Sequence, residues 1–90
     1  MSEPLFPMGQ LLISRTALES LSHRDIHQAL TCHASGEFGD LCPADIKENI
    51  FSIDCQLRIL SKYKGEGGDD FYVETAADRS HTTVYLCDEY

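Results

Sequence analysis

The stretch from Cys42 to Lys64 constrains the fold of this 90-residue chain more than any other. Large apolar residues recur in it every three or four positions, at Ile46, Ile50, Ile53, Leu57 and Leu60. This spacing places side chains on one face of an α-helix. Pro43 suits the first helical turn, where its missing N–H would have no partner. We therefore predict one long helix that ends before Gly65, with the rest of the chain packed against its apolar face.

Two short helices are predicted before this long one. Thr16 and Ser22 each stand three positions ahead of an acidic residue, which is a capping-box pattern at a helix start. The helices should cover residues 17–21 and about 23–33, meeting at a corner. Phe38 follows in a loop between two glycines, and we expect it to fill the gap between helices.

Three segments have the composition of β-strands. A short apolar run covers residues 10–14, and residues 71–75 and 82–86 alternate between apolar and polar side chains. The fold class should be α+β, with a three-stranded antiparallel sheet built from the first strand and the C-terminal hairpin, and helices on one face. Residues 1–8 should form an irregular arm and residues 9–90 a single domain. The predicted core contains Leu12, Ile26, Leu30, Ile50, Ile53, Leu57, Leu60, Val73 and Val84.

Charge limits the partners that the chain can bind directly. The net charge is −8, from fifteen carboxylates against seven Lys and Arg residues. Direct binding to nucleic acid would need basic residues to neutralise phosphates, so we expect none. The acidity fits a partner with a basic surface, or solubility alone. Residues 1–9 lack the charge and apolar pattern of a signal peptide, and no apolar run is long enough to span a membrane, so we expect a cytoplasmic protein.

The cysteines and histidines give weak signals for chemistry. None of the four cysteines belongs to a C-x-x-C pair, so we expect reduced, mostly buried thiols, no metal and no cofactor. His23 and His27 share a helix face, but a third ligand would have to come from elsewhere. The alternative is a mixed metal site made of Cys32, His33, Cys42 and Cys55. A Cys–His nucleophile pair is the main enzymatic alternative, although no oxyanion hole or phosphate-binding loop accompanies it, and we expect no catalytic residues.

Acidic residues gather around the start of the long helix. Those that we predict to bind a partner are Glu37, Asp40, Asp45 and Glu48. Spaced carboxylates on a rigid helix can imitate a row of phosphates and occupy a basic channel. The alternative is a solvated helix face, because acids near a helix N-terminus are favoured by the macrodipole.

A second candidate site lies at the tip of the predicted hairpin. It would be a pocket that combines Asn49, Asp78 and Arg79 with the loop from Gly36 to Asp40. Arg79 is a single cation in an acidic stretch, so the structural alternative is an internal ion pair with Asp78 or Asp45.

The tail from residue 71 reads FYVETAADRSHTTVYLCDEY, and residues 36–41 read GEFGDL, with Asp45, Asn49 and LSKY at 60–63 between them. Together these segments resemble a family of small bacterial plasmid and mobile-element proteins, some of them labelled as type I restriction-associated. The resemblance covers about Met8 to Tyr90 and carries no catalytic or binding residues. It implies a setting in which small acidic proteins antagonise host defence, as anti-CRISPR and antirestriction proteins do.

The predicted function is therefore that of a non-enzymatic acidic interaction protein of mobile genetic elements. It would inhibit a host nucleic-acid-targeting defence complex by occupying a basic surface. The alternative is a small enzyme or ligand-binding domain that uses the hairpin tip and the loop from Gly36 to Asp40. A homodimer without further chemistry is a third interpretation.

Overall fold

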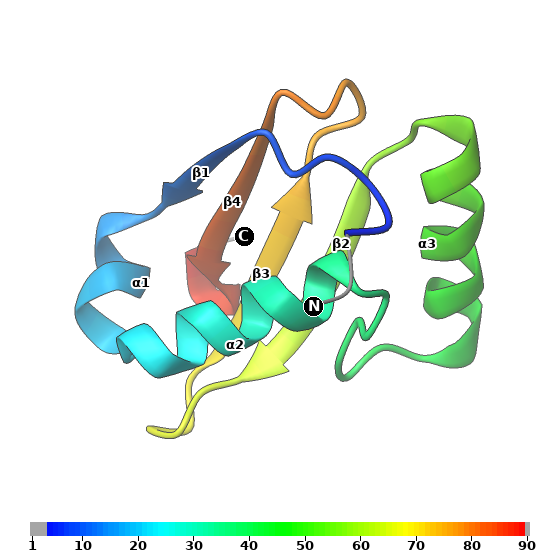
Figure 1. Ribbon diagram of the computed structural model, residues 1–90. Coiled ribbons are helices and arrows are strands. Elements are labelled where there is room, and N and C mark those ends of the chain that lie inside the picture. Colours follow the sequence, from blue (N-terminus) through cyan, green and yellow to red (C-terminus); the bar gives the residue numbers. More distant parts are fainter. Residues whose placement is uncertain (1–3, 90) are drawn as a thin grey trace.

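The computed structural model describes residues 4–89 of the chain. These residues form three α-helices, a four-stranded sheet and one terminal 3₁₀ turn. In order they are β1 (Gln10–Ile13), α1 (Arg15–Ser20), α2 (His23–Ala34), α3 (Pro43–Cys55), β2 (Ile59–Lys64), β3 (Asp70–Thr75), β4 (His81–Leu86) and η1 (Cys87–Glu89). Helices α1 and α2 lie against one face of the sheet, and α3 stands beside the β2 edge (Figure 1).

The α+β class and the C-terminal hairpin are confirmed, but the predicted three-stranded antiparallel sheet is wrong. The strand order is β1-β4-β3-β2, and the sheet is mixed. Strands β2, β3 and β4 form an antiparallel meander, whereas β1 runs parallel to β4. The additional strand, β2, comes from the part of the chain that the apolar spacing assigned to the long helix.

The long helix ends at Cys55 because Gln56 adopts a left-handed conformation, with φ 55° and ψ 49°. Its backbone N–H and that of Leu57 both donate to the carbonyl of Ser52, which closes the last turn. After this turn the alternation of a strand begins, with Ile59 buried and Leu60 half-buried. The helical stripe is therefore interrupted, and its last two members are not helical.

The predicted core is correct for Val73 and Val84 of the C-terminal hairpin, and partly wrong on the helices and on the other two strands. Val73, Val84 and Ile26 are buried as predicted, while Leu30 and Ile53 pack at the edge of the core. Leu60 is only half-buried. Three predicted core residues are exposed instead, with exposed fractions of 41%, 55% and 47%: Leu12, Ile50 and Leu57. The reason is that β1 is an edge strand, while Ile50 lies on the outer face of α3 and Leu57 in the turn after it.

Both short helices exist. The capping residue of α1 differs from the predicted one, whereas that of α2 is the predicted one. Helix α1 is capped by Ser14, whose Oγ accepts from the N–H of Ala17, rather than by Thr16. Helix α2 begins as predicted at Ser22, whose Oγ accepts from the N–H of Asp25. Each cap fixes where the chain leaves one element and enters the next.

The helix-facing side of the sheet carries two apolar clusters. The larger one contains Ala17, Leu21, Ile26, Ala29, Phe71, Val73, Val84 and Leu86. The smaller one contains Phe6, Phe38 and Ile59, with Met8, Leu41, Ile46 and Ile53 packed against it. Phe38 thus packs against α3 and, edge to face, against a histidine of α2, as predicted. Of the predicted irregular arm, residues 4–8 form no helix or strand and bury Phe6, while residues 1–3 lie outside the described part.

A chain of buried polar side chains lies among these residues. His33 is fully buried, with Nδ1 2.5 Å from Ser61 Oγ and Nε2 2.9 Å from Thr75 Oγ1. Thr75 Oγ1 is 2.7 Å from Thr82 Oγ1, and Thr82 donates to the carbonyl of Met8. Because a carbonyl can only accept, the chain runs in one direction, with Nε2–H donating and Nδ1 accepting. Burial lowers the pKa of His33 to about 4, so the ring is neutral at pH 7.

Candidate functional site

The four predicted partner-binding acids are all exposed and lie on one continuous part of the chain. Glu37 and Asp40 belong to the connection between α2 and α3, and Asp45 and Glu48 to the first half of α3. The sequence placed them correctly on a loop and the outer part of a helix. Their exposure leaves the carboxylates hydrated and accessible to a partner.

The connection between α2 and α3 is fixed to the edge of β2. Lys62 donates its N–H to the carbonyl of Phe38 and accepts from the N–H of Asp40, at 3.1 and 2.8 Å. Gly39, between them, has φ 77°, and a Cβ placed there would lie 1.9 Å from the Lys62 carbonyl oxygen. Only glycine permits this approach, so the position of Asp40 is set by the sheet.

Helix α3 is fixed to the same edge by one amide side chain. Asn49 is buried and donates from Nδ2 to the carbonyl of Leu60, while its Oδ1 accepts from the N–H of Leu60. The amide thereby takes the place of a neighbouring strand. As a result, the carboxylates of Asp45 and Glu48 stand on a helix that is tied to the sheet.

A groove of about 390 Å³ lies between α3 and β2 and includes part of the acidic surface. Its carboxylates are those of Asp45 and Glu48, and its apolar lining comes from Leu41, Leu57 and Leu60. Arg58 also lines it, and this cation is paired with Glu74 at 3.0 Å. An Arg or Lys side chain could bind here, with its alkyl stem packed along the leucines and its charged end at the carboxylates. The sequence did not predict the groove, because it placed Leu57 and Leu60 in a helix, and residues 59–64 (ILSKYK) do not alternate clearly between apolar and polar side chains.

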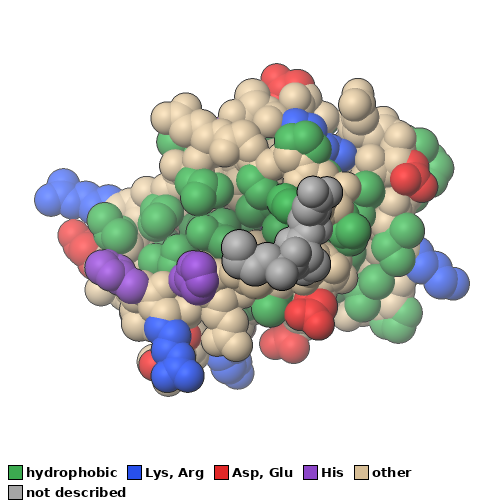
Figure 2. Space-filling model, viewed as in Figure 1, with side chains coloured by type: hydrophobic (Ala, Val, Ile, Leu, Met, Phe, Trp, Pro, Cys, Tyr) green, Lys and Arg blue, Asp and Glu red, His purple; other side chains and the backbone are tan. Residues whose placement is uncertain are grey.

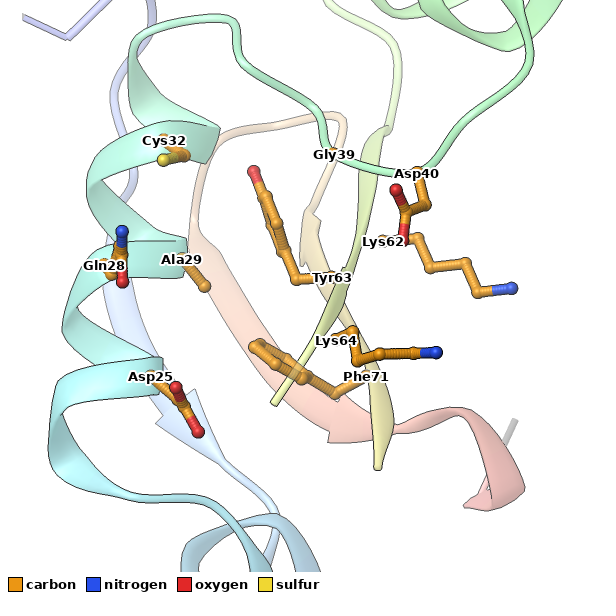
Figure 3. Close-up of a pocket in the computed structure, with 10 residues that line it drawn as sticks. All are labelled: Asp25, Gln28, Ala29, Cys32, Gly39, Asp40, Lys62, Tyr63, Lys64 and Phe71. Carbon is orange, nitrogen blue, oxygen red and sulfur yellow. The ribbon is translucent and has the colours of Figure 1, made fainter. Parts of the chain in front are cut away.

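A second groove, of about 340 Å³, lies between α2 and β2 (Figure 3). Tyr63 and Cys32 line it together with Asp40. The hydroxyl of Tyr63 donates to the Glu37 carbonyl at 2.6 Å, and burial raises the pKa of Tyr63. Burial, with a smaller effect of Glu37, also raises the pKa of the Cys32 thiol. Both groups are therefore held in their protonated forms, which is the reverse of nucleophile activation.

Arg79 stabilises the end of α3. Its guanidinium donates to the carbonyls of Ser52 at 2.9 Å and Leu57 at 2.7 Å, and it stands 5.6 Å from the ring centre of Phe6. A cation at the C-terminal end of a helix is favoured by the macrodipole. These carbonyls take the place of the predicted carboxylate partners, so the expectation of an ion pair with Asp78 or Asp45 is wrong.

The three residues of the alternative pocket have separate structural roles. Asn49 lines the α3–β2 groove, whereas neither Asp78 nor Arg79 does. Asp78 accepts from the N–H of Ser80 in the hairpin turn, and hydrogen bonding to Ser80 lowers the pKa of its carboxyl group. The Asp40 side chain belongs to the other groove.

The proposed metal ligands do not come together. Both ring nitrogens of His33 are hydrogen-bonded to side chains, which leaves it no lone pair for a metal. Cys42 and Cys55 are exposed, and Cys32 and Cys87 are half-buried, so the expectation of mostly buried thiols is wrong. Cys42 precedes α3 and Cys55 is its last residue. Within residues 4–89, no three or more His, Cys, Asp or Glu side chains form a group that could hold a metal ion.

Comparisons with known proteins give no match: none with a family model, none with a curated protein and none with a solved structure. In the described part of the chain, no helix has both the length and the apolar character needed to cross a membrane.

Proposed function

We propose that this chain is a non-enzymatic binding protein that presents Glu37, Asp40, Asp45 and Glu48 to a basic surface of a protein partner. The α3–β2 groove is the centre of this surface. It accepts an Arg or Lys side chain of the partner between the leucines and the carboxylates of Asp45 and Glu48. Binding through carboxylates disfavours nucleic acid as a direct ligand and favours basic surfaces, a class that includes surfaces that bind nucleic acid.

The observation that carries the proposal is the attachment of this acidic surface to the sheet edge. Asn49 holds α3 against Leu60, and the bonds of Lys62 hold the preceding loop. Because the backbone that carries these carboxylates is already ordered, binding costs only the ordering of their side chains, which favours recognition by a partner. The net charge of −8 adds long-range attraction to a basic partner.

The resemblance to mobile-element proteins suggests which partner this is. A plasmid or phage gains from blocking a nucleic-acid-targeting complex of its host, and the channel of such a complex is basic. The proposed activity is therefore inhibition of the anti-CRISPR or antirestriction type, by occupation of that channel.

The alternative of a small enzyme or ligand-binding domain has less support. It requires a pocket that gathers Asp40, Asp45, Asn49, Asp78 and Arg79. In the structure, Asp40 lines one groove, Asp45 and Asn49 line another, and Arg79 is committed to the carbonyls at the end of α3.

The proposal can be tested without the partner by NMR titration of the full chain with an arginine-rich peptide. We expect the largest shift changes at Asp45, Glu48 and the leucines of the α3–β2 groove. The double variant Asp45→Lys/Glu48→Lys should abolish them, whereas Glu66→Lys/Asp69→Lys, in the exposed loop before β3, should retain them. Changes spread evenly over all acidic residues would contradict a defined site.

A further inference from the structure

The two edges of the sheet differ in whether other parts of the chain satisfy their outward backbone groups. At the β2 edge, Asn49 satisfies the outward backbone groups of Leu60, and the loop before α3 satisfies those of Lys62. At the opposite edge, β1 has no such cover among the described residues. An uncovered edge strand is a template for another strand, and proteins commonly cap or charge it.

The hydrogen bonds of β1 identify which of its backbone groups have no partner within residues 4–89. Gln10 and Ser14 donate their N–H groups to Ser80 and Val84 of the β4 segment, at 3.0 and 2.9 Å. In a parallel ladder, alternate residues face the neighbouring strand, so Leu12 shares this direction. The N–H and C=O groups of Leu11 and Ile13 therefore point away from the sheet.

The side chains around this edge are apolar and exposed. Exposed fractions are 52%, 41% and 37% for Leu11, Leu12 and Ile13. Leu18 of α1 is exposed as well, and a groove of about 420 Å³, lined in part by Leu11 and the α2 residue Leu30, runs beside β1. Figure 2 shows hydrophobic side chains gathered on this face between β1 and α2.

The charge around the edge is nearly balanced, unlike that of the whole chain, because one carboxylate from outside this segment, that of Glu89, accepts from Ser14 Oγ at the end of β1. Residues 10–36 contain two arginines, Arg15 and Arg24, and two acids, Glu19 and Asp25, so their formal charge is zero while the chain carries −8. Two copies of an acidic chain repel each other over most of their surfaces. The β1 edge is a region where they can meet with much less of that repulsion.

We propose that β1 pairs with the β1 strand of a second copy, antiparallel and about a two-fold axis at Leu12. Leu11 of one copy then lies opposite Ile13 of the other, and each pair exchanges two N–H···O=C bonds. The two Leu12 residues face each other across the axis. The result is a continuous eight-stranded sheet with an isologous interface.

A second copy fits this edge better than a strand of a basic partner. The free backbone groups are symmetric about Leu12, so one strand supplies both halves of the pairing. A basic segment would find little excess of negative charge here, whereas the acidic surface on α3 offers a larger one. Strands of four residues bury little area compared with the ~1,200 Å² of a stable interface, so the α1 and α2 side chains beside the edge must contribute, and the dimer should depend on concentration.

Sedimentation equilibrium of the full chain tests the proposal. The mass should rise from 10.1 kDa toward twice that value between micromolar and near-millimolar concentrations. Amide hydrogen exchange locates the interface: Leu11 and Ile13 should gain protection as concentration rises, whereas the Leu12 amide, which faces β4, should be protected throughout.

Matched variants separate this edge from other apolar surfaces. Ile13→Lys should keep the chain monomeric, and Ile50→Lys, on the exposed face of α3, should leave association unchanged. Circular dichroism confirms that both fold. A chain that stays monomeric at every concentration would overturn the proposal, as would a dimer in which the Leu11 and Ile13 amides still exchange rapidly.

Discussion

Asn49 of α3 pairs with both backbone groups of Leu60 on β2, donating to its carbonyl at 2.7 Å and accepting from its N–H at 3.1 Å. The amide satisfies the two outward backbone groups of Leu60, as a fifth strand at this edge would do. It also sets where the acidic first half of α3 stands relative to the sheet. This amide therefore contributes both to the stability of the fold and to the geometry of the proposed binding surface.

Replacing Asn49 with Leu should destabilise the fold by about 1–3 kcal/mol, because two backbone groups at a half-buried edge lose their partners. Asn49→Asp should also lower stability, since a carboxylate accepts from the Leu60 N–H but cannot donate to the carbonyl. Urea unfolding followed by circular dichroism measures both. Wild-type stability for Asn49→Leu would show that water replaces the amide without cost.

Acid should destabilise the chain through His33. Its pKa is about 4 in the fold against an ordinary value of 6.5, so the unfolded chain binds the additional proton first. Stability should therefore be complete above about pH 6.5 and fall as the pH drops toward 4, by roughly 3 kcal/mol in all.

Denaturant unfolding at several pH values tests this in His33 and His27 variants. His33→Gln should remove most of the His33-dependent slope between pH 6.5 and 4, although it will also lower stability at pH 7 because the side-chain network is altered. His27→Gln, at an exposed position on the same helix, should keep the slope. Equal slopes in the wild type and His33→Gln would mean that other groups cause the acid sensitivity.

Gly39 should tolerate no side chain. Gly39→Ala places a Cβ against the Lys62 carbonyl at a backbone angle that disfavours L-residues, and we expect a loss of at least about 2 kcal/mol. Gly67→Ala is the control, because its Cβ meets no atom within 4 Å and its φ is not positive. Thermal melts of the two variants should differ clearly, and coinciding melts would contradict the close packing of the loop on β2.

Arg79 should matter for stability rather than for partner binding. Arg79→Gly removes the donors to Ser52 and Leu57 while accommodating the positive φ of 61° at this position. We expect a loss of about 1.5–3 kcal/mol, the range for hydrogen bonds to a charged group. Unchanged stability together with impaired binding of the arginine-rich peptide would contradict this role and indicate that Arg79 belongs to the binding site.

The elements that the sequence predicts best are those whose pattern is local. Phe71 and Val73 alternate with polar residues, and Ser22 caps a helix directly behind it, so the hairpin and α2 follow from neighbouring positions. The end of α3 does not, because Gln56 stops the helix in a conformation that Arg79, from a distant turn, supports. Residues 57–60 continue the helical spacing by coincidence.

Pairing between distant strands is equally hidden from a single sequence. Nothing near Leu12 states that its strand runs parallel to β4, or that it occupies an edge. The buried position of His33 could not be predicted either, because its hydrogen-bond partners, Ser61 and Thr75, are distant in the sequence. For the acidic surface, exposure could be predicted from charge alone, whereas the groove required knowing that Leu60 lies on a strand.

The proposed surface predicts that position, and not net charge, decides affinity. A fourfold variant replaces Glu37, Asp40, Asp45 and Glu48 with Lys. A second variant makes the same change at exposed acids elsewhere, at Glu19, Glu66, Asp69 and Asp88. Each reversal adds two charges, so both variants move from −8 to zero.

The most direct measurement is the affinity of both variants for an arginine-rich peptide by calorimetry, at low and physiological salt, with folding checked by circular dichroism. We predict that the first variant loses binding at both salt concentrations. The second should keep it and show weaker salt dependence, because only long-range attraction is screened beyond ~8–10 Å. Equal losses in the two folded variants would contradict a defined acidic binding surface on α3 and its preceding loop.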